Sequence, residues 1–344
     1  MSLYLDNGYV NIRWVLGLGL QFNYIVGGRG TGKTFTSLKT LIEDKLKFML
    51  MRRTQTQADM ISKPEFSPFK PINRMLNCNI GFVQLSKANA GICNLVDDGK
   101  KLVQDGEFLG YTCALSTISN MRGFDSSDCK VLLYDEFIPE SHEKPIKNEG
   151  AAFSNAYETI NRNRELDGFP PLQALCLANA NNLSNPIFAE YGIVETAYNM
   201  VKRGTEVYIN RDRSIGLFML QDSPISKKKS ETGLYKASAN KKFKRMAISN
   251  VFDVNDENVS SRNLKEYVPI LNIGNELTIY EHKSRNEYYV SEHLNHNCPY
   301  FGTDEVSLRR MFDRFNFLMS AYIDATIYFE KVLCEIKFKE YFKF

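Results

Sequence analysis

The sequence predicts an α/β protein whose mainly parallel sheet is covered by helices on both faces, followed by a smaller C-terminal α+β domain. Three observations support this prediction. Short apolar runs alternate with helix-compatible segments over roughly the first two thirds of the chain, a glycine-rich loop follows the first strong run, and the composition changes near Asp222. Alternating strands and helices favour a parallel sheet, because each crossover helix returns the chain to the same edge.

The composition limits the classes of protein that this chain can be. Its 344 residues suffice for one large or two ordinary domains. The 43 basic and 40 acidic residues are too evenly balanced for a protein that coats nucleic acid by charge alone, so any such site must be local. Seven cysteines without a C-x-x-C pair indicate a reduced, cytosolic setting. No secretory signal or membrane-spanning run is evident, so we expect no membrane partner.

Four apolar runs, each bounded by polar residues or glycine, are predicted to form the strands of the sheet. They lie at residues 22–26, 48–51, 131–134 and 172–177. Two longer segments between them have the length and composition of helices, at residues 34–47 and 151–164. The first two thirds of the chain therefore predict a sheet between helix layers.

The loop after the first strand reads Gly-Gly-Arg-Gly-Thr-Gly-Lys-Thr and matches the phosphate-loop pattern G-x-x-x-x-G-K-[ST] without a gap. Glycines let successive backbone N–H groups turn toward an anion at the positive end of the following helix. Lys33 is predicted to reach the β- and γ-phosphates, and the Thr34 hydroxyl to bind Mg²⁺. The predicted nucleotide-binding residues of this loop are Gly27, Gly28, Arg29, Gly30, Thr31, Gly32, Lys33 and Thr34.

A second phosphate-site element lies where the strand at residues 131–134 ends in two adjacent acids, Asp135 and Glu136. The first acid is placed to hold the Mg²⁺ shell, and the second to polarise an attacking water as general base. A guanine-specific Asn-Lys-x-Asp signature is missing, since Asn240-Lys241-Lys242-Phe243 lacks the acid. The sequence therefore favours ATP as the nucleotide.

Two weaker signals accompany this pair. Asn179 follows a neighbouring strand, where its amide can sense the γ-phosphate or orient the water, although Asn-rich turns are also common after strands. Arg162 and Arg164 stand two residues apart, and one of them can stabilise the charge of a transferring phosphoryl group across a subunit boundary. The alternative is a surface ion pair with Glu158 or Glu165.

Beyond residue 222 the pattern changes. Residues 227–245 hold eight basic residues and one acid and are predicted to form a linker or small subdomain. Strands follow at residues 267–274, 276–282 and 287–292, and one long helix spanning residues 318–336 closes the chain. The predicted domains are residues 1–222, 223–245 and 246–344.

Three blocks of residues, 25–34, 134–138 and 161–165, resemble in this order the DNA-packaging ATPases of small protein-primed podophages, relatives of the large terminase subunits. The resemblance covers most of the first 225 residues and continues, more weakly, through the last hundred. It implies a P-loop NTPase of the additional-strand, catalytic-glutamate type. It also implies a C-terminal RNase H-like domain that is vestigial as a nuclease.

The function implied by this resemblance is ATP-driven translocation of double-stranded DNA into a preformed capsid. The family implies a homomeric ring, usually of five subunits, that uses ATP and Mg²⁺ and docks on the portal. A structural RNA as a further partner is left open. We expect such a protein in the host cytoplasm, docked transiently on the procapsid portal and absent from the mature virion.

The resemblance also assigns roles to individual residues. Lys33 and Thr34 match the phosphate and Mg²⁺ residues, Asp135 the metal-holding acid and Glu136 the catalytic glutamate. Arg162 matches the trans-acting arginine finger. Arg29 matches the arginine of the family's phosphate loop, with a helix-surface charge as the alternative.

For DNA contact the resemblance points to Arg122, in the loop before the Asp-Glu strand, where this family places a basic pore residue. A single phosphate-directed cation per subunit suits gripping without reading sequence. Arg52 and Arg53, after the second strand, are further candidates for DNA or for a neighbour's nucleotide. A solvated arginine pair is their alternative.

Two further site types are weighed in the C-terminal third. A two-metal nuclease needs several acids, but Asn272 stands where the strand at residues 267–274 should carry one, so we predict no cutting. His293, His296 and Cys298 do not have the spacing of a common zinc site and are predicted to form a polar loop.

Two other function classes remain. One is a non-hydrolysing, nucleotide-dependent assembly switch or scaffold, which the Asp135–Glu136 pair opposes. The other is a terminase with an active nuclease, which Asn272 opposes.

Overall fold

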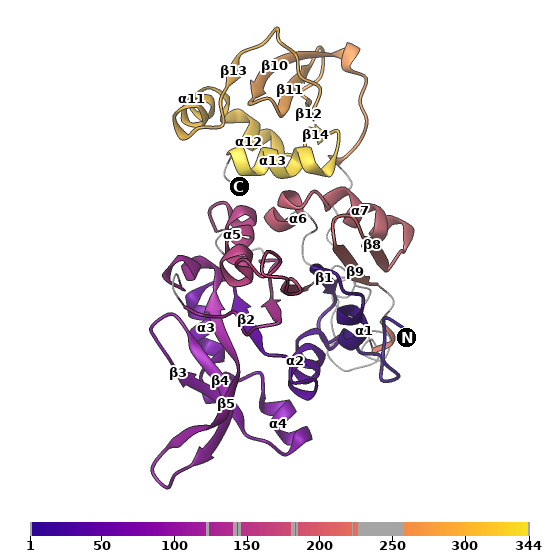
Figure 1. Cartoon of the computed structure of the whole chain (residues 1–344). Coiled ribbons are helices and arrows are strands. Elements are labelled where there is room, and N and C mark those ends of the chain that lie inside the picture. The colour runs from indigo at the N-terminus through magenta and orange to yellow at the C-terminus, as the bar shows by residue number, and fades with distance from the viewer. Residues whose placement is uncertain are drawn as a thin grey trace. The chain divides into compact units, whose positions relative to one another are not determined.

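The computed structural model describes residues 2–121, 124–139, 143, 146–179, 183, 185–221, 223–225 and 258–342. The chain folds into two compact units (Figure 1). Unit 1 comprises Met1–Tyr191 and Thr196–Asp253, and unit 2 comprises Gly192–Glu195 and Val254–Phe344. Most of the predicted basic linker, and the predicted boundary at residue 246, lie outside the described residues. Within the described ranges, no helix combines the length and apolar composition needed to cross a bilayer.

Unit 1 is built on a nine-stranded sheet with the strand order β3-β4-β5-β2-β6-β7-β1-β9-β8. The six central strands, from β5 to β9 in this order, run parallel, and β3, β4 and β8 are antiparallel to their neighbours. The strands are β1 (Phe22–Gly27), β2 (Phe48–Arg52), β3 (Ile80–Gln84), β4 (Ala90–Asp97), β5 (Leu102–Ala114), β6 (Val131–Asp135), β7 (Gln173–Asn179), β8 (Val207–Asn210) and β9 (Ile215–Leu220). The four strands predicted for this sheet are therefore confirmed.

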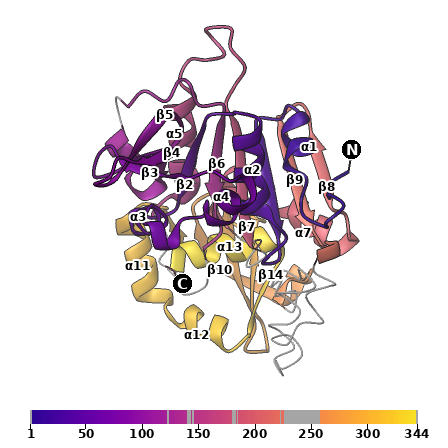
Figure 2. The same ribbon diagram turned by 90° about the horizontal axis from the view of Figure 1, so that it is seen from below.

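Helices cover both faces of this sheet, because successive side chains of its buried strands point to opposite faces. On β1, Ile25 packs in the core that includes Leu38 of α2, whereas Tyr24 meets Phe188 of α6. Figure 2 shows α2 lying over the sheet. The helices of the first 203 residues are α1 (Ile12–Gly17), α2 (Lys33–Glu43), α3 (Gln55–Ile61), α4 (Lys70–Leu76), α5 (Glu149–Asn161), α6 (Pro186–Glu190) and α7 (Val194–Arg203). Unit 1 also has a single 3-10 turn at Pro64–Phe66 and two 3-10 turns within Leu115–Met121, joined by a kink at Thr117.

Unit 2 has a five-stranded sheet with the order β13-β10-β11-β12-β14. Strands β10 to β12 are antiparallel, β13 runs parallel to β10, and β14 runs parallel to β12. Three helices pack their apolar residues against one face of this sheet. The elements are β10 (Tyr267–Ile273), β11 (Leu277–His282), β12 (Tyr288–Ser291), β13 (Tyr300–Phe301), α11 (Glu305–Phe315), α12 (Phe317–Ile323), β14 (Ile327–Phe329) and α13 (Val332–Phe342).

The predicted long helix at the end of the chain is wrong. The chain forms α12, then strand β14, then α13. Helix α12 ends at Ile323 with Asp324 as its C-cap, and Ala325 adopts a left-handed conformation with φ of 54°, which no helix continues. The β-branched and aromatic residues that follow pair with β12, with Ile327 opposite Tyr288. The spacing of the apolar residues in this segment is compatible with a helix, but pairing with β12 makes residues 327–329 a strand.

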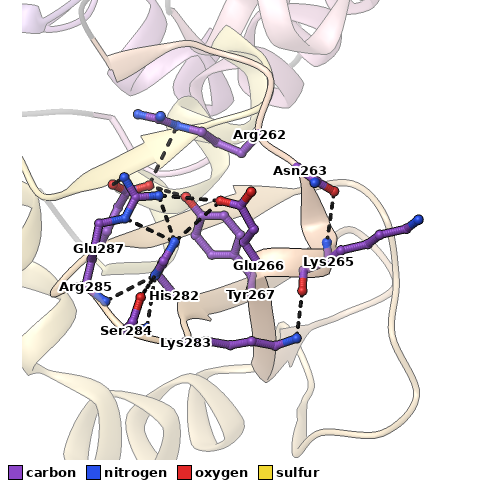
Figure 3. A network of polar contacts seen from close by, with 10 residues as sticks. All are labelled: Arg262, Asn263, Lys265, Glu266, Tyr267, His282, Lys283, Ser284, Arg285 and Glu287. Carbon is purple, nitrogen blue, oxygen red and sulfur yellow. Dashed lines mark hydrogen bonds and ion pairs between the residues drawn. The ribbon is translucent and has the colours of Figure 1, made fainter.

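A polar network holds the turn between β11 and β12 (Figure 3). The Nδ1 atom of buried His282 accepts the backbone N–H groups of Ser284 and Arg285, both at 3.1 Å. The Tyr267 hydroxyl donates to Glu287, and its ring meets the edge of His282. These contacts connect the start of β10 to the β11–β12 hairpin and fix this end of the unit 2 sheet.

Candidate nucleotide site

The predicted phosphate-binding elements meet at one edge of the unit 1 sheet, where the parallel strands β1, β7 and β6 end. The register pairs Gly27 of β1 with Asn179 of β7, and Leu177 of β7 with Asp135 of β6. Strand β7 therefore lies between the strand that enters the phosphate loop and the strand that ends in the acids. The carboxyl edge of a parallel sheet is where α/β proteins bind ligands.

The phosphate loop has the backbone that an anion site needs. Gly30 and Gly32 have φ of 75° and 83°, a region that favours glycine. A Cβ on Gly32 would also lie 2.6 Å from the ring of Tyr9, so the contact with Tyr9 requires glycine as well. Gly32 provides no side-chain cap for α2. Glycine thus has no side chain that would compete with an anion for the N–H groups of the first turn.

Lys33 is buried and folds back on the loop. Its Nζ atom donates to the carbonyl oxygens of Gly27 and Gly28, both at 2.9 Å, and lies 3.4 Å from Oδ1 of Asn179. The buried Thr31 hydroxyl donates to Gly28 O at 3.0 Å and braces the loop. The structure thus brings Asn179 to the ammonium group of Lys33, at the edge where the sequence predicted it.

The two acids have different environments. Asp135 is buried, and its Oδ1 accepts the Thr34 hydroxyl at 2.9 Å. Glu136 follows with φ of 60°, and its side chain is 49% exposed. Both acids line a cavity of about 520 Å³ with the phosphate loop; its lining residues are Arg29, Gly30, Gly32, Lys33, Thr34, Phe35, Asp135, Glu136, Ala178 and Asn179.

Arg52 belongs to this same site, although the sequence suggested contact with DNA or with a neighbour's nucleotide. Its guanidinium donates to Oδ2 of Asp135 and to Oε2 of Glu136, both at 2.6 Å. The parallel register explains this placement: Met51 pairs with Tyr134, so the next residues of β2 and β6 are Arg52 and Asp135. Sequence reasoning missed the contact because it treated the ends of the two strands separately.

Arg53 turns to the opposite side, and its predicted role as a DNA contact is wrong in this structure. The side chain is 1% exposed and forms a two-pronged ion pair with Glu149 of α5, with N–O distances of 2.7 and 3.0 Å. Burial raises the pKa of the Tyr134 hydroxyl well above its ordinary value, so that hydroxyl stays protonated 3.5 Å from Glu149. Arg53 is therefore a buried structural cation.

Arg162 does not lie near the phosphate loop of its own chain. It follows α5 at the amino edge of the sheet. There the side-chain oxygen of Asn161 accepts the N–H of Leu172, just before β7, at 2.8 Å. Buried Arg164 donates to the backbone oxygen of Ser127, before β6, at 2.9 Å. Arg162 itself has φ of 52° and ψ of −141° and donates to Phe124 O at 2.6 Å. The length of a strand thus separates Arg162 from the nucleotide edge.

The remaining predicted residues are distributed as follows. Arg29 is exposed at the mouth of the cavity. Arg122 lies outside the described residues, so its DNA-contact role remains a prediction.

In unit 2, Asn272 is buried and donates to the backbone oxygen of Asn295, within the predicted polar loop, at 2.7 Å. Over the described part of the chain, no group of three or more His, Cys, Asp or Glu residues is arranged to hold a metal ion.

Comparison with known proteins agrees with this geometry. A family model described as "Podovirus DNA encapsidation protein (Gp16)" matches residues 6–296. The "DNA packaging protein" of Bacillus phage B103 is 25% identical over 177 residues, which are 50% of this chain and 48% of that relative. This chain therefore matches about half the length of that curated relative.

Two solved structures match nearly the whole chain. One is "The Phi-28 gp11 DNA packaging Motor", with 17% identity and a TM-score of 0.65 over 98% of this chain and 99% of that one. The other is "The bacteriophage Phi-29 viral genome packaging motor assembly", with 18% identity and a TM-score of 0.61 over 99% of both. At these identities the likeness establishes the fold.

Proposed function

The chain belongs to the podovirus DNA encapsidation protein (Gp16) family, and from this membership we propose that it hydrolyses ATP to drive double-stranded DNA into a preformed capsid through the portal. The observation that carries the proposal is the contact of the Thr34 hydroxyl with Asp135, beside Lys33 and Glu136, in one cavity. This is the donor set that Mg²⁺ and a nucleoside triphosphate require. The relatives named above are described as packaging proteins and motors, which supports the same function.

The residues of the site fit a magnesium–ATP complex. The N–H groups of the loop and of α2 would bind phosphate oxygens, and Lys33 would exchange its two carbonyl contacts for the β- and γ-phosphates. Thr34 and Asp135 would hold Mg²⁺, which would offset the negative charge of the phosphates. Strand β7, inserted between β1 and β6, supports the additional-strand class of P-loop NTPase.

Glu136 would act as the general base that accepts a proton from the attacking water. Its carboxylate lines the cavity and is half exposed, so a water can reach it. Arg52 holds one oxygen of Glu136 and one of Asp135, which offsets the repulsion between the two acids and orients Glu136. Asn179, within reach of Lys33, would contact the γ-phosphate or the water.

We assign Arg162 to the nucleotide of a neighbouring subunit. A strand's length lies between Arg162 and the phosphate loop of its own chain, so it can complete a site only in a second copy. A homomeric ring is the arrangement in which every copy both gives and receives this arginine. We infer that copies of this chain form such a ring, which the mixing experiment below tests. We also infer that the ring works at the portal of a capsid in the host cell and binds DNA through Arg122.

Unit 2 would be an RNase H-like domain without nuclease activity. Its three antiparallel strands, with β13 parallel beside β10, support that topology. The neutral, buried Asn272 supports the loss of cutting, because a two-metal site needs acids there.

The experiment is ATP hydrolysis measured with and without linear duplex DNA. Lys33→Ala should lose nucleotide binding. Arg162→Ala should bind ATP and turn it over about 10³–10⁵-fold more slowly, the usual effect of a lost arginine finger. Arg74→Ala, an exposed arginine of α4, is the matched control and should match the wild type.

Mixing the two inactive variants tests the trans assignment. The intact Arg162 of a Lys33→Ala subunit should restore turnover in the pocket of an Arg162→Ala neighbour. No recovery at any mixing ratio would contradict the trans role. Nucleotide binding without hydrolysis by the wild-type chain would favour the switch or scaffold class instead.

A further inference from the structure

The loop that follows α5 exposes two large apolar side chains. Leu166 is 86% exposed, the highest value among the large apolar side chains of the described residues, and Phe169 is 60% exposed. Nothing in unit 1 covers them over the described part of the chain, and exposed apolar side chains of this size close together mark an interaction site. Residues 162–169 are called the finger loop below, because they begin with Arg162.

The finger loop is held rigidly. The N–H of Asp167 donates to Asn163 O at 2.9 Å, and the N–H of Phe169 donates to Arg164 O at 2.8 Å. Buried Arg164 ties the loop to Ser127 O at 2.9 Å. A loop already fixed in this way loses little conformational entropy when its apolar side chains dock.

The backbone at the start of the finger loop is strained. Arg162, which is not glycine, has φ of 52° and ψ of −141°, a region rarely adopted by residues with a side chain. The strain is maintained by the contacts of Asn161 and Arg164 on either side. Arg162, whose side chain is 43% exposed, and Leu166 belong to the same short loop, so both can contact one partner surface.

The charges on either side of Leu166 distinguish between two partners, DNA and a second copy of this chain. Leu166 lies between Glu165 and Asp167, both exposed. Two carboxylates would be repelled by the phosphates of DNA, which bind cations. The rim of the nucleotide cavity instead carries the exposed cation Arg29, and the half-exposed acid of that cavity, Glu136, is already paired with Arg52. The acidic flanks thus complement the cavity rim of another copy.

We propose that Leu166 and Phe169 anchor the finger loop on the rim of the nucleotide cavity of a second copy of this chain, and so position Arg162 in that cavity. The proposal rests on the trans role of Arg162 proposed above and adds the contact that holds the two copies together. Leu166 and Phe169 are positioning residues, since they act through Arg162 and touch no reacting atom.

The test is the dependence of ATP turnover on protein concentration. The double variant Leu166→Ser/Phe169→Ser should need at least tenfold more protein for half-maximal turnover per chain, because buried apolar anchors dominate interfaces. Its affinity for ATP as a dilute monomer should be unchanged. The matched control is Val96→Ser/Leu102→Ser, two side chains 49% and 51% exposed on β4 and β5, and it should show the wild-type dependence.

Each other outcome has a definite meaning. An unchanged concentration dependence in the finger-loop variant overturns the proposal. So does normal self-association with a loss of turnover only when DNA or capsids are added, which would assign the two side chains to those partners. The proposed function fails separately if the wild-type chain, run in the same assay, binds ATP without hydrolysing it. Single Leu166→Ser, with its melting temperature measured, checks that the change leaves the fold intact.

Discussion

The polar groups at the candidate nucleotide site of unit 1 and those around Asn272 in the sheet of unit 2 are organised in opposite ways. In unit 1, Lys33, Arg52 and Glu136 are charged and line or border a cavity. In unit 2, Asn272 accepts the Thr278 hydroxyl at 2.5 Å and donates to Asn295 O, and all of these groups are neutral. One region keeps charges that a ligand can recruit, whereas the other satisfies its polar atoms internally.

This difference is the one expected between the proposed nucleotide site and a structural network. Lys33 and Arg52 contact partners that phosphates, a metal ion or a water can replace, so the site is arranged for exchange. The hydroxyl of Thr278 both donates to Asn272 and accepts the N–H of Asn295, at 2.5 and 3.2 Å. A buried group whose partners are all protein atoms stabilises the fold and has no capacity left for a ligand.

Among the changes that test this comparison, the largest expected effect is the loss of turnover in Glu136→Gln. The amide cannot accept the proton of water, and loss of a general base costs about 10²–10⁴-fold in rate. ATP binding should persist, because Lys33 and the loop remain. The control is Glu281→Gln, an exposed acid on β11 of unit 2, which should turn over normally. Turnover of Glu136→Gln within a few-fold of wild type would remove Glu136 from the reaction.

The next effect is on the stability of unit 1. Glu149→Ala leaves the guanidinium of Arg53 buried without its bidentate partner and should lower the free energy of unfolding by about 3–5 kcal/mol. The single tryptophan, Trp14, packs against Phe218 in unit 1, so its fluorescence reports this unit.

The control for this stability change is Glu43→Ala. It removes a partly exposed partner of Lys39 and should cost less than about 1 kcal/mol. Equal losses of unfolding free energy in the two variants would mean that the buried ion pair of Arg53 with Glu149 does not stabilise the fold.

The smallest effect is expected in unit 2. Thr278→Val removes the hydroxyl between Asn272 and Asn295 and leaves a buried oxygen without a donor, a loss of about 1–3 kcal/mol. Hydrogen exchange of the β10 and β11 amides should accelerate accordingly, while ATP affinity stays the same. Thr303→Val, with an exposed side chain, is the control. A fall in ATP affinity in Thr278→Val would break the separation between the two regions.

Much of unit 1 was predictable from local patterns. The apolar runs of β1, β2, β6 and β7 are each buried on both faces, so their composition alone distinguishes them from turns. Helix ends were less predictable. The segment predicted to continue to Arg164 stops at Asn161, because the side chain of Asn161 binds the N–H of Leu172 and Arg162 turns left-handed.

The sequence by itself determined that there is a phosphate loop and an acidic strand end, because these depend on residues adjacent in the chain. The tertiary structure decided the roles of three arginines. The pairing of β2 with β6 placed Arg52 on the two acids, and the face of β2 turned Arg53 into the core beside Glu149. The direction of α5 carried Arg162 to the far edge of the sheet. The role of an arginine depends on the charged groups beside it. Here sheet register and helix direction determine those groups, and both are set by residues far apart in the chain.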